Sequence, residues 1–274
     1  MHGSNYPFTV RLSGFSPAEN ALLEALLSQG PGAGPSYSCL HDDSLQEPDL
    51  AIANGDSPVA VARLGCLPPG ALQPALVIGA PTSNRWRSLA RPVTALALHD
   101  ALAGLLDARV QVMVERSTCS QRVVAERRRR PRLAPDGESP AFYTRLRRAP
   151  PDGAVLIVDK ECSIRNHVAR VLAPRRVPVE WTDSLCAAVR LCDETPVSLV
   201  MINTSAPGIE PYEWCSSIKS QQGADRTPVV FLVGRAFRYD AVRARRAGVR
   251  GLLDQPVAGR DLIVTLQKLL DLPV

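Results

Sequence analysis

The sequence predicts an α/β protein with two domains, each built on a five-stranded parallel sheet of order 2-1-3-4-5 with helices on both faces. At 274 residues and 45% hydrophobic content, the chain is long enough to bury a core in each domain. From residue 154 onward, short apolar runs alternate with amphipathic segments. The first half repeats this alternation in weaker form, which indicates an internal duplication.

The second half contains five strand-like runs, each followed by a helix-like segment. Strands are expected at 154–159, 177–181, 198–203, 228–234 and 251–255, and helices at 163–172, 184–194, 211–221, 239–248 and 259–271. Short, almost continuously apolar strands joined through helices are typical of a parallel sheet that is buried on both faces. Right-handed crossovers then give the doubly wound strand order.

The first half supplies matching segments for most of these elements. Residues 48–58 parallel 197–207, residues 73–80 parallel the fourth strand, and residues 89–107 parallel 252–271. FTVRLSG is expected to form the first strand and SPAENALLEALLSQ its helix, with Ser16 as N-cap and Pro17 at the first helical position. The stretch from Ile78 to Arg91 is too short for a fourth helix and a fifth strand, so this copy is expected to be trimmed there.

The chain therefore divides into a trimmed first domain (1–107), an Arg-rich connector (108–150) and a second domain (151–274). The start of the connector is compatible with a helix that extends the last helix of the first domain. Its remainder contains proline and glycine and resembles a linker.

Several function classes are excluded by what the sequence lacks. No apolar run approaches the roughly 20 residues that span a bilayer, and the first residues lack the features of a secretory signal. Seven cysteines form no C-x-x-C pair, so neither a zinc site nor a disulfide framework is indicated. We expect a cytoplasmic, bacterial protein without a metal or cofactor.

Four separated motifs in the second half carry a family resemblance. LIVDKE, LVMINTSAPG, TPVVFLVG and AGVRGLLDQPV follow one another at the intervals of a response-regulator receiver domain, whose fold is flavodoxin-like. The resemblance implies a site at the carboxyl ends of the strands, where acidic residues hold Mg²⁺ and an aspartate accepts a phosphoryl group. A lysine and a hydroxyl on later strands then sense the new phosphate.

The residues at these positions depart from the family pattern. The second copy has Asp159, Lys160 and Glu161 in the acidic position, Asn203 for the phosphoacceptor, Val233 for the hydroxyl and Gln255 for the lysine. The first copy has Asn54 for the phosphoacceptor and Arg91 for the lysine, with nothing left for that charge to sense. A neutral amide is no phosphoryl acceptor, and Mg²⁺ needs several oxygen ligands. The sequence predicts two pseudo-receivers in which Asn203 keeps hydrogen bonding and packing.

Two groups of arginines remain as candidate binding residues. The connector group is Arg127, Arg128, Arg129, Arg130, Arg132, Arg145, Arg147 and Arg148. It would suit cyclic di-GMP, nucleic acid or an acidic protein surface, and a solvated linker explains it equally well. The partner group is Arg243, Arg246 and Arg250, on the helix that the receiver family uses for output and dimerisation. An exposed helix with no partner is the alternative.

The favoured function is a non-enzymatic signalling adaptor that contacts a partner protein without being phosphorylated. The alternative is an effector that binds cyclic di-GMP or nucleic acid through the connector. A homodimer through the last helices is a further candidate assembly. No catalytic residue is expected.

Overall fold

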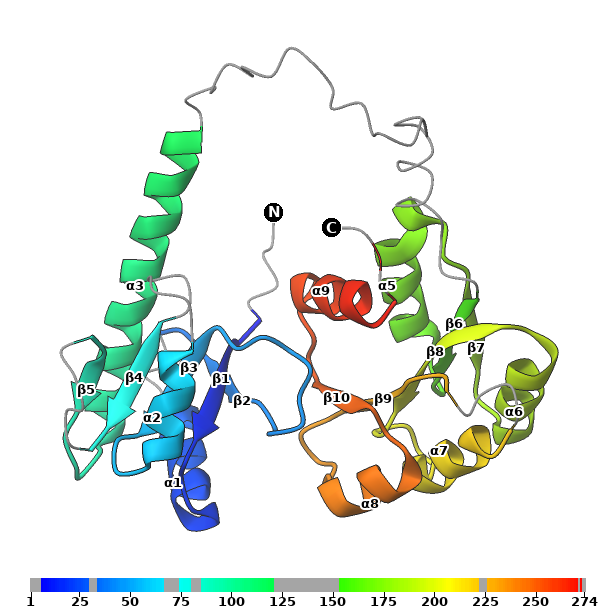
Figure 1. The fold of residues 1–274 in the computed structure, drawn as a ribbon, viewed down its shortest axis with the longest axis horizontal. Coiled ribbons are helices and arrows are strands. Elements are labelled where there is room, and N and C mark those ends of the chain that lie inside the picture. The colour runs from blue at the N-terminus through cyan, green and yellow to red at the C-terminus, as the bar shows by residue number, and fades with distance from the viewer. Residues whose placement is uncertain are drawn as a thin grey trace, which may run out of the picture. The chain divides into compact units, whose positions relative to one another are not determined.

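The computed structural model describes residues 6–29, 34–66, 74–79, 85–120, 153–221, 226–270 and 272. These residues form two compact units (Figure 1). Described residues from 6–42 and 47–120 make the first unit, and those from 43–46 and 153–272 make the second. No helix among the described residues is long and apolar enough to cross a membrane.

The first unit is a five-stranded parallel sheet of order β2-β1-β3-β4-β5. Its strands are β1 (Phe8–Ser13), β2 (Tyr37–Cys39), β3 (Leu50–Asn54), β4 (Ala75–Ile78) and β5 (Arg87–Leu89). Its helices are α1 (Pro17–Ser28), α2 (Pro58–Gly65) and α3 (Ala95–Ser120). Apolar residues of α1 and α3 pack on one face of the sheet, and those of α2 pack on the other. The expected order is confirmed.

The first unit keeps its fifth strand although the stretch before that strand is short. Strand β4 ends at Ile78 and β5 begins at Arg87, whereas the longer corresponding stretch of the second unit, residues 234–250, includes α8 (Ala241–Ala247). The fifth strand still pairs with its neighbour, with Val77 opposite Ser88. Helix α3 continues past residue 107, where the sequence suggested a domain boundary, as far as Ser120.

The second unit has the same order in its own numbering, β7-β6-β8-β9-β10. Its strands are β6 (Ala154–Val158), β7 (Val179–Thr182), β8 (Val197–Asn203), β9 (Val229–Val233) and β10 (Gly251–Asp254). Its helices are α5 (Cys162–Leu172), η1 (Ala173–Arg175), α6 (Leu185–Glu194), α7 (Pro211–Lys219), α8 and α9 (Gly259–Leu269). All five expected strands and all five expected helices are present.

The core of the second unit lies on both faces of its sheet. Side chains of α6, α7 and α8 cover one face, where Phe231 is fully buried. Side chains of α5 and α9 cover the other, around Leu199 and Met201. Every residue of β6 and β9 is buried, as expected for central strands of a doubly wound sheet, and every residue of the edge strand β10 is buried as well. This rigid sheet fixes the positions of the loops at its carboxyl edge.

Candidate functional site

The carboxyl ends of the second sheet bring the expected site residues together. Asp159 follows β6, Asn203 ends β8, Val233 ends β9 and Gln255 follows β10. Because the strands are parallel and paired in register, with Asn203 opposite Leu232 and Asp254 opposite Val233, these ends meet at one edge. The structure therefore assembles at one edge the residues that the sequence singled out.

Asn203 connects two strand ends through its side-chain amide. Its Nδ2 donates to Oδ1 of Asp159 at 3.0 Å, and its Oδ1 accepts from the backbone N–H of Ser205 at 3.1 Å. The second bond fixes which end of the amide is which, because a backbone N–H is only a donor. The amide N–H group must therefore face Asp159, and Asn203 ties the end of β8 to the end of β6.

Asp159 depends on this amide because it is buried. Asp159 is 2% exposed, and its Oδ2 has no hydrogen-bond partner among the residues that the structure describes. The neighbouring Lys160 does not pair with it, because Nζ of Lys160 donates to the backbone oxygen of Asp183 at 2.9 Å and lies 3.9 Å from the Asp183 carboxylate. Within the described part of the chain, the bond from Asn203 is thus the only hydrogen bond that the Asp159 carboxylate accepts.

The residues at this edge do not fit the Mg²⁺ that the family resemblance implies. The ion prefers an octahedral set of oxygen ligands. Here an N–H group points at Asp159 where another oxygen would be needed. Glu161 is exposed and begins α5 without a side-chain capping bond. Within the described residues, no group of three or more His, Cys, Asp or Glu could hold a metal ion.

The other two expected positions also lack the implied chemistry. Val233 is buried at the end of β9 and offers only an apolar side chain. Gly234 follows it, and a Cβ at that position would collide with Oγ of Ser205 and lie 3.5 Å from Oε1 of Gln255. Gln255 donates its backbone N–H to the Val233 oxygen at 2.8 Å. The loops close on one another through small and neutral groups.

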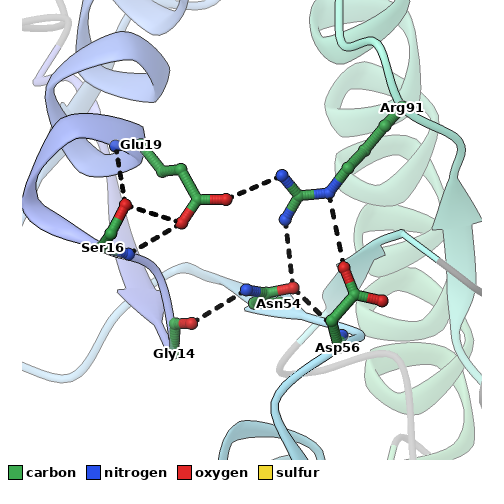
Figure 2. A network of polar contacts seen from close by, with 6 residues as sticks. All are labelled: Gly14, Ser16, Glu19, Asn54, Asp56 and Arg91. Carbon is green, nitrogen blue, oxygen red and sulfur yellow. Dashed lines mark hydrogen bonds and ion pairs between the residues drawn. The ribbon is translucent and has the colours of Figure 1, made fainter.

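The first unit repeats the asparagine arrangement (Figure 2). Nδ2 of Asn54 donates to the backbone oxygen of Gly14 at 2.9 Å, and its Oδ1 accepts from the N–H of Asp56 at 3.0 Å. As in the second unit, the amide binds the N–H two residues later and reaches the loop after the first strand. A second feature is shared by the two units: the residue after the fifth strand region, at the position of the family's lysine, precedes a cis-proline, in the peptide bonds Arg91–Pro92 and Gln255–Pro256.

Arg91 is surrounded by acceptors, which corrects the expectation that nothing remains for its charge to contact. Its guanidinium donates to Glu19 at 2.7 Å and to Oδ1 of Asn54 at 3.1 Å, and it lies 3.7 Å from Asp56 (Figure 2). These oxygens come from α1, β3 and the loop that follows β3. The first unit thus carries an exposed arginine, ion-paired within the unit, at the edge where the family pattern has metal and phosphate.

Glu19 is held in its charged form by the same network. Hydrogen bonds from the Ser16 backbone N–H, from Arg91 and from the Ser16 hydroxyl lower the pKa of Glu19 to about 2. The sequence S-P-A-E already has the pattern of a capping box, in which Ser16 and Glu19 each satisfy the other's backbone N–H. Only the fold shows that this glutamate also contacts Arg91.

We expect Glu19 to make the first unit sensitive to acid. A carboxyl whose folded pKa lies below its unfolded value stabilises the fold above the unfolded pKa, and this contribution is lost as pH falls toward about 2. Glu19→Gln should therefore lower stability at pH 7 and flatten its decline below pH 5. Denaturant unfolding from pH 7 to pH 2 checks this, with Glu24→Gln on the same helix as the control. Parallel curves for wild type and Glu19→Gln would contradict it.

The remaining candidates separate into placed and unplaced residues. Arg243 and Arg246 lie exposed on α8, and Arg250 lies exposed just before β10. The connector arginines, residues 127–130, 132, 145, 147 and 148, lie outside the described residues, so their ligand-binding role stays a prediction. Sequence reasoning missed Tyr212, whose ring is the platform beneath Arg243.

Comparison with known proteins agrees with the receiver-domain resemblance of the second half. Residues 155–267 match the family model of the response regulator receiver domain. The heme response regulator HssR of Staphylococcus aureus is 24% identical over 115 residues, which are 42% of this chain and 50% of HssR. The response regulator PleD of Caulobacter vibrioides is 28% identical over 110 residues, which are 40% of this chain and 24% of PleD.

Solved structures give matches of similar extent. The chemotaxis response regulator CheY4 of Vibrio cholerae is 23% identical, and the match covers 43% of this chain and 98% of that chain with a TM-score of 0.39. The chain thus spans half of HssR and about a quarter of PleD. Motifs, strand order and family model agree that residues 155–267 are similar to a response regulator receiver domain.

Proposed function

We propose that this chain is a phosphorylation-independent signalling adaptor, a tandem of two pseudo-receivers that acts by protein contact and not by catalysis. The observation that carries the proposal is the amide of Asn203, which donates to Asp159 where a receiver needs an anionic acceptor. Asn54 makes the corresponding bond in the first unit. Neither asparagine can form an acyl phosphate, because the nucleophile in that reaction is a carboxylate oxygen.

The internal bonds at both edges support a structural role for these residues. Asn203 satisfies a buried carboxylate, and Arg91 is held by Glu19, Asn54 and Asp56. A conformational equilibrium shifts only when a ligand binds its two states with different affinity. In the absence of phosphorylation, the input that we propose is the binding of a partner or ligand. The exposed arginines Arg243, Arg246 and Arg250 are the contact residues that we assign to it.

The phosphorylation claim is tested by incubating the full chain with acetyl phosphate and Mg²⁺ and measuring its intact mass. We expect no phosphoryl adduct, for the wild type and for Asn203→Ala alike. A phosphorylatable receiver domain treated in parallel is the positive control. A wild-type adduct that is lost after hydroxylamine treatment, which cleaves acyl phosphates, would overturn the proposal.

A further inference from the structure

Helices α7 and α8 line a groove that the sequence did not predict. Its volume is about 510 Å³. Tyr212, Glu213, Ser216 and Ser217 line it from α7, and Arg243 and Arg246 line it from α8. It lies on the sheet face that α6, α7 and α8 cover, away from α5 and α9.

The wall of the groove is fixed before any ligand arrives. The Tyr212 ring packs edge-on against Phe231 with ring centroids 5.5 Å apart, and its hydroxyl accepts the backbone N–H of Asp240 at 2.8 Å. Asp240 in turn caps α8 by accepting the N–H groups of Val242 and Arg243. Binding to such a preorganised wall costs little ordering entropy.

The charge of the groove selects an anionic occupant. The Arg243 guanidinium carbon lies over the Tyr212 ring, 4.5 Å from its centroid, and a guanidinium stacked in this way can still use its in-plane N–H groups for hydrogen bonds. Among the described residues, no carboxylate pairs with the side chain of Arg243 or of Arg246. The neighbouring Arg245 points elsewhere, toward Asp43 at 4.0 Å. Two unpaired guanidinium groups beside two serines favour carboxylates, with which Arg forms paired hydrogen bonds.

Two features favour a peptide over a nucleic acid or a polyphosphate. Glu213 lies in the same lining and would repel a continuous row of phosphates, whereas a peptide can place an N–H group opposite it. The aromatic face that could stack on a base is covered by Arg243. Spaced carboxylates on an extended chain meet both conditions.

We propose that the α7–α8 groove binds an acidic, extended segment of a partner protein through Arg243 and Arg246. The inference rests on the proposed adaptor function and names the place and the chemistry of its contact. It also divides the partner group expected from the sequence, because Arg250 does not line the groove.

The test is titration of the isotope-labelled full chain with an eight-residue peptide of alternating glutamate and serine, followed by amide chemical shifts. We expect saturable shifts at Tyr212, Ser216, Ser217 and Arg246. Arg243→Glu with Arg246→Glu should weaken binding by at least about tenfold, because two attractive contacts become repulsive. Arg165→Glu with Arg170→Glu, the same charge change on α5, should leave affinity within about twofold.

A second variant guards against a folding defect in the charge-reversed protein. Glu213→Gln keeps the shape of the wall and removes its opposing carboxylate, so it should tighten peptide binding by about threefold. Three results would overturn the inference: no saturable shifts, equal weakening by the α5 variant, or tighter binding of a single-stranded oligonucleotide of the same charge in this groove. If the peptide does not bind and no phosphoryl adduct forms, the groove is not the contact site and the adaptor proposal still holds. An adduct would overturn that proposal whatever the peptide does.

Discussion

Asn203→Ala is expected to destabilise the second unit by about 1–3 kcal/mol, the cost of leaving a buried polar group unsatisfied. The substitution removes the bond to Asp159, whose other carboxylate oxygen already lacks a partner in the described part of the chain, and the bond from the Ser205 N–H. Asp159 is 2% exposed, so water reaches it poorly in the folded state. Denaturant unfolding, followed by hydrogen exchange of β6 and β8, measures the effect in this unit.

The control for this prediction is Asn166→Ala on α5. Asn166 is exposed, and among the described residues its side chain accepts a single bond, from the adjacent Arg165, so its loss should change stability by less than about 0.5 kcal/mol. If Asn203→Ala were equally mild, the amide would not hold the ends of β6 and β8 together as we propose.

Asn203→Asp tests whether the hydrogen bond from the amide matters, because the substitution keeps the size of the side chain and removes the donor. It places a carboxylate against Asp159 within the present 3.0 Å hydrogen-bond distance. Two carboxylates so close cannot both ionise easily, which raises one folded pKa above its unfolded value. A raised carboxyl pKa gives stability at low pH that is lost as pH rises. The deficit of Asn203→Asp relative to wild type should therefore be largest at neutral pH and shrink on acidification.

Gly14→Ala is expected to produce the largest loss in the first unit. Gly14 has a φ of +81°, and an added Cβ would lie 2.6 Å from the Ala60 Cβ and 2.8 Å from the Ser57 Cβ. The left-handed backbone costs about 1–2 kcal/mol for a residue with a Cβ, and overpacking adds about 1–3 kcal/mol. Because the Gly14 oxygen accepts a hydrogen bond from Asn54, a shift of the backbone at Gly14 would also disturb that bond.

Gly208→Ala is the matched control for Gly14→Ala. Gly208 also has a positive φ, +74°, but an added Cβ there meets nothing within 4 Å. It should pay the backbone cost alone, and the difference between the two variants measures the collision. Hydrogen exchange of β1 and β3 locates the loss for Gly14→Ala. Equal effects in the two variants would mean that α2 moves away without cost.

The sequence was sufficient to predict the second unit because each of its elements follows a local pattern. Fully apolar runs such as 229–233 gave the strands, and residues 259–269 gave an amphipathic helix. The first unit was predicted less completely. Its three-residue strands, Tyr37–Cys39 and Arg87–Leu89, are too short for a periodicity signal and form because neighbouring strands pair with them.

The candidate site was predictable in membership and not in contacts. The motifs placed Asp159, Asn203, Val233 and Gln255 at one edge, because parallel strands end together. No local pattern shows that Arg91 meets Glu19, which is 72 positions away, or that Tyr212 supports Arg243. Such long-range contacts depend on how the helices pack on the sheet. Only the structure therefore shows that the charge of Arg91 is paired with Glu19.

The central claim is that the amide of Asn203 replaces the metal and phosphate chemistry of a receiver. Amide spectra of the isotope-labelled full chain, recorded with and without Mg²⁺ and beryllofluoride, a mimic of the phosphoryl group, test it most directly. We predict unchanged signals for Asn203, Thr204, Gly234 and Gln255. Saturable shifts of these four signals that require both reagents would show a working phosphoryl site and contradict the account.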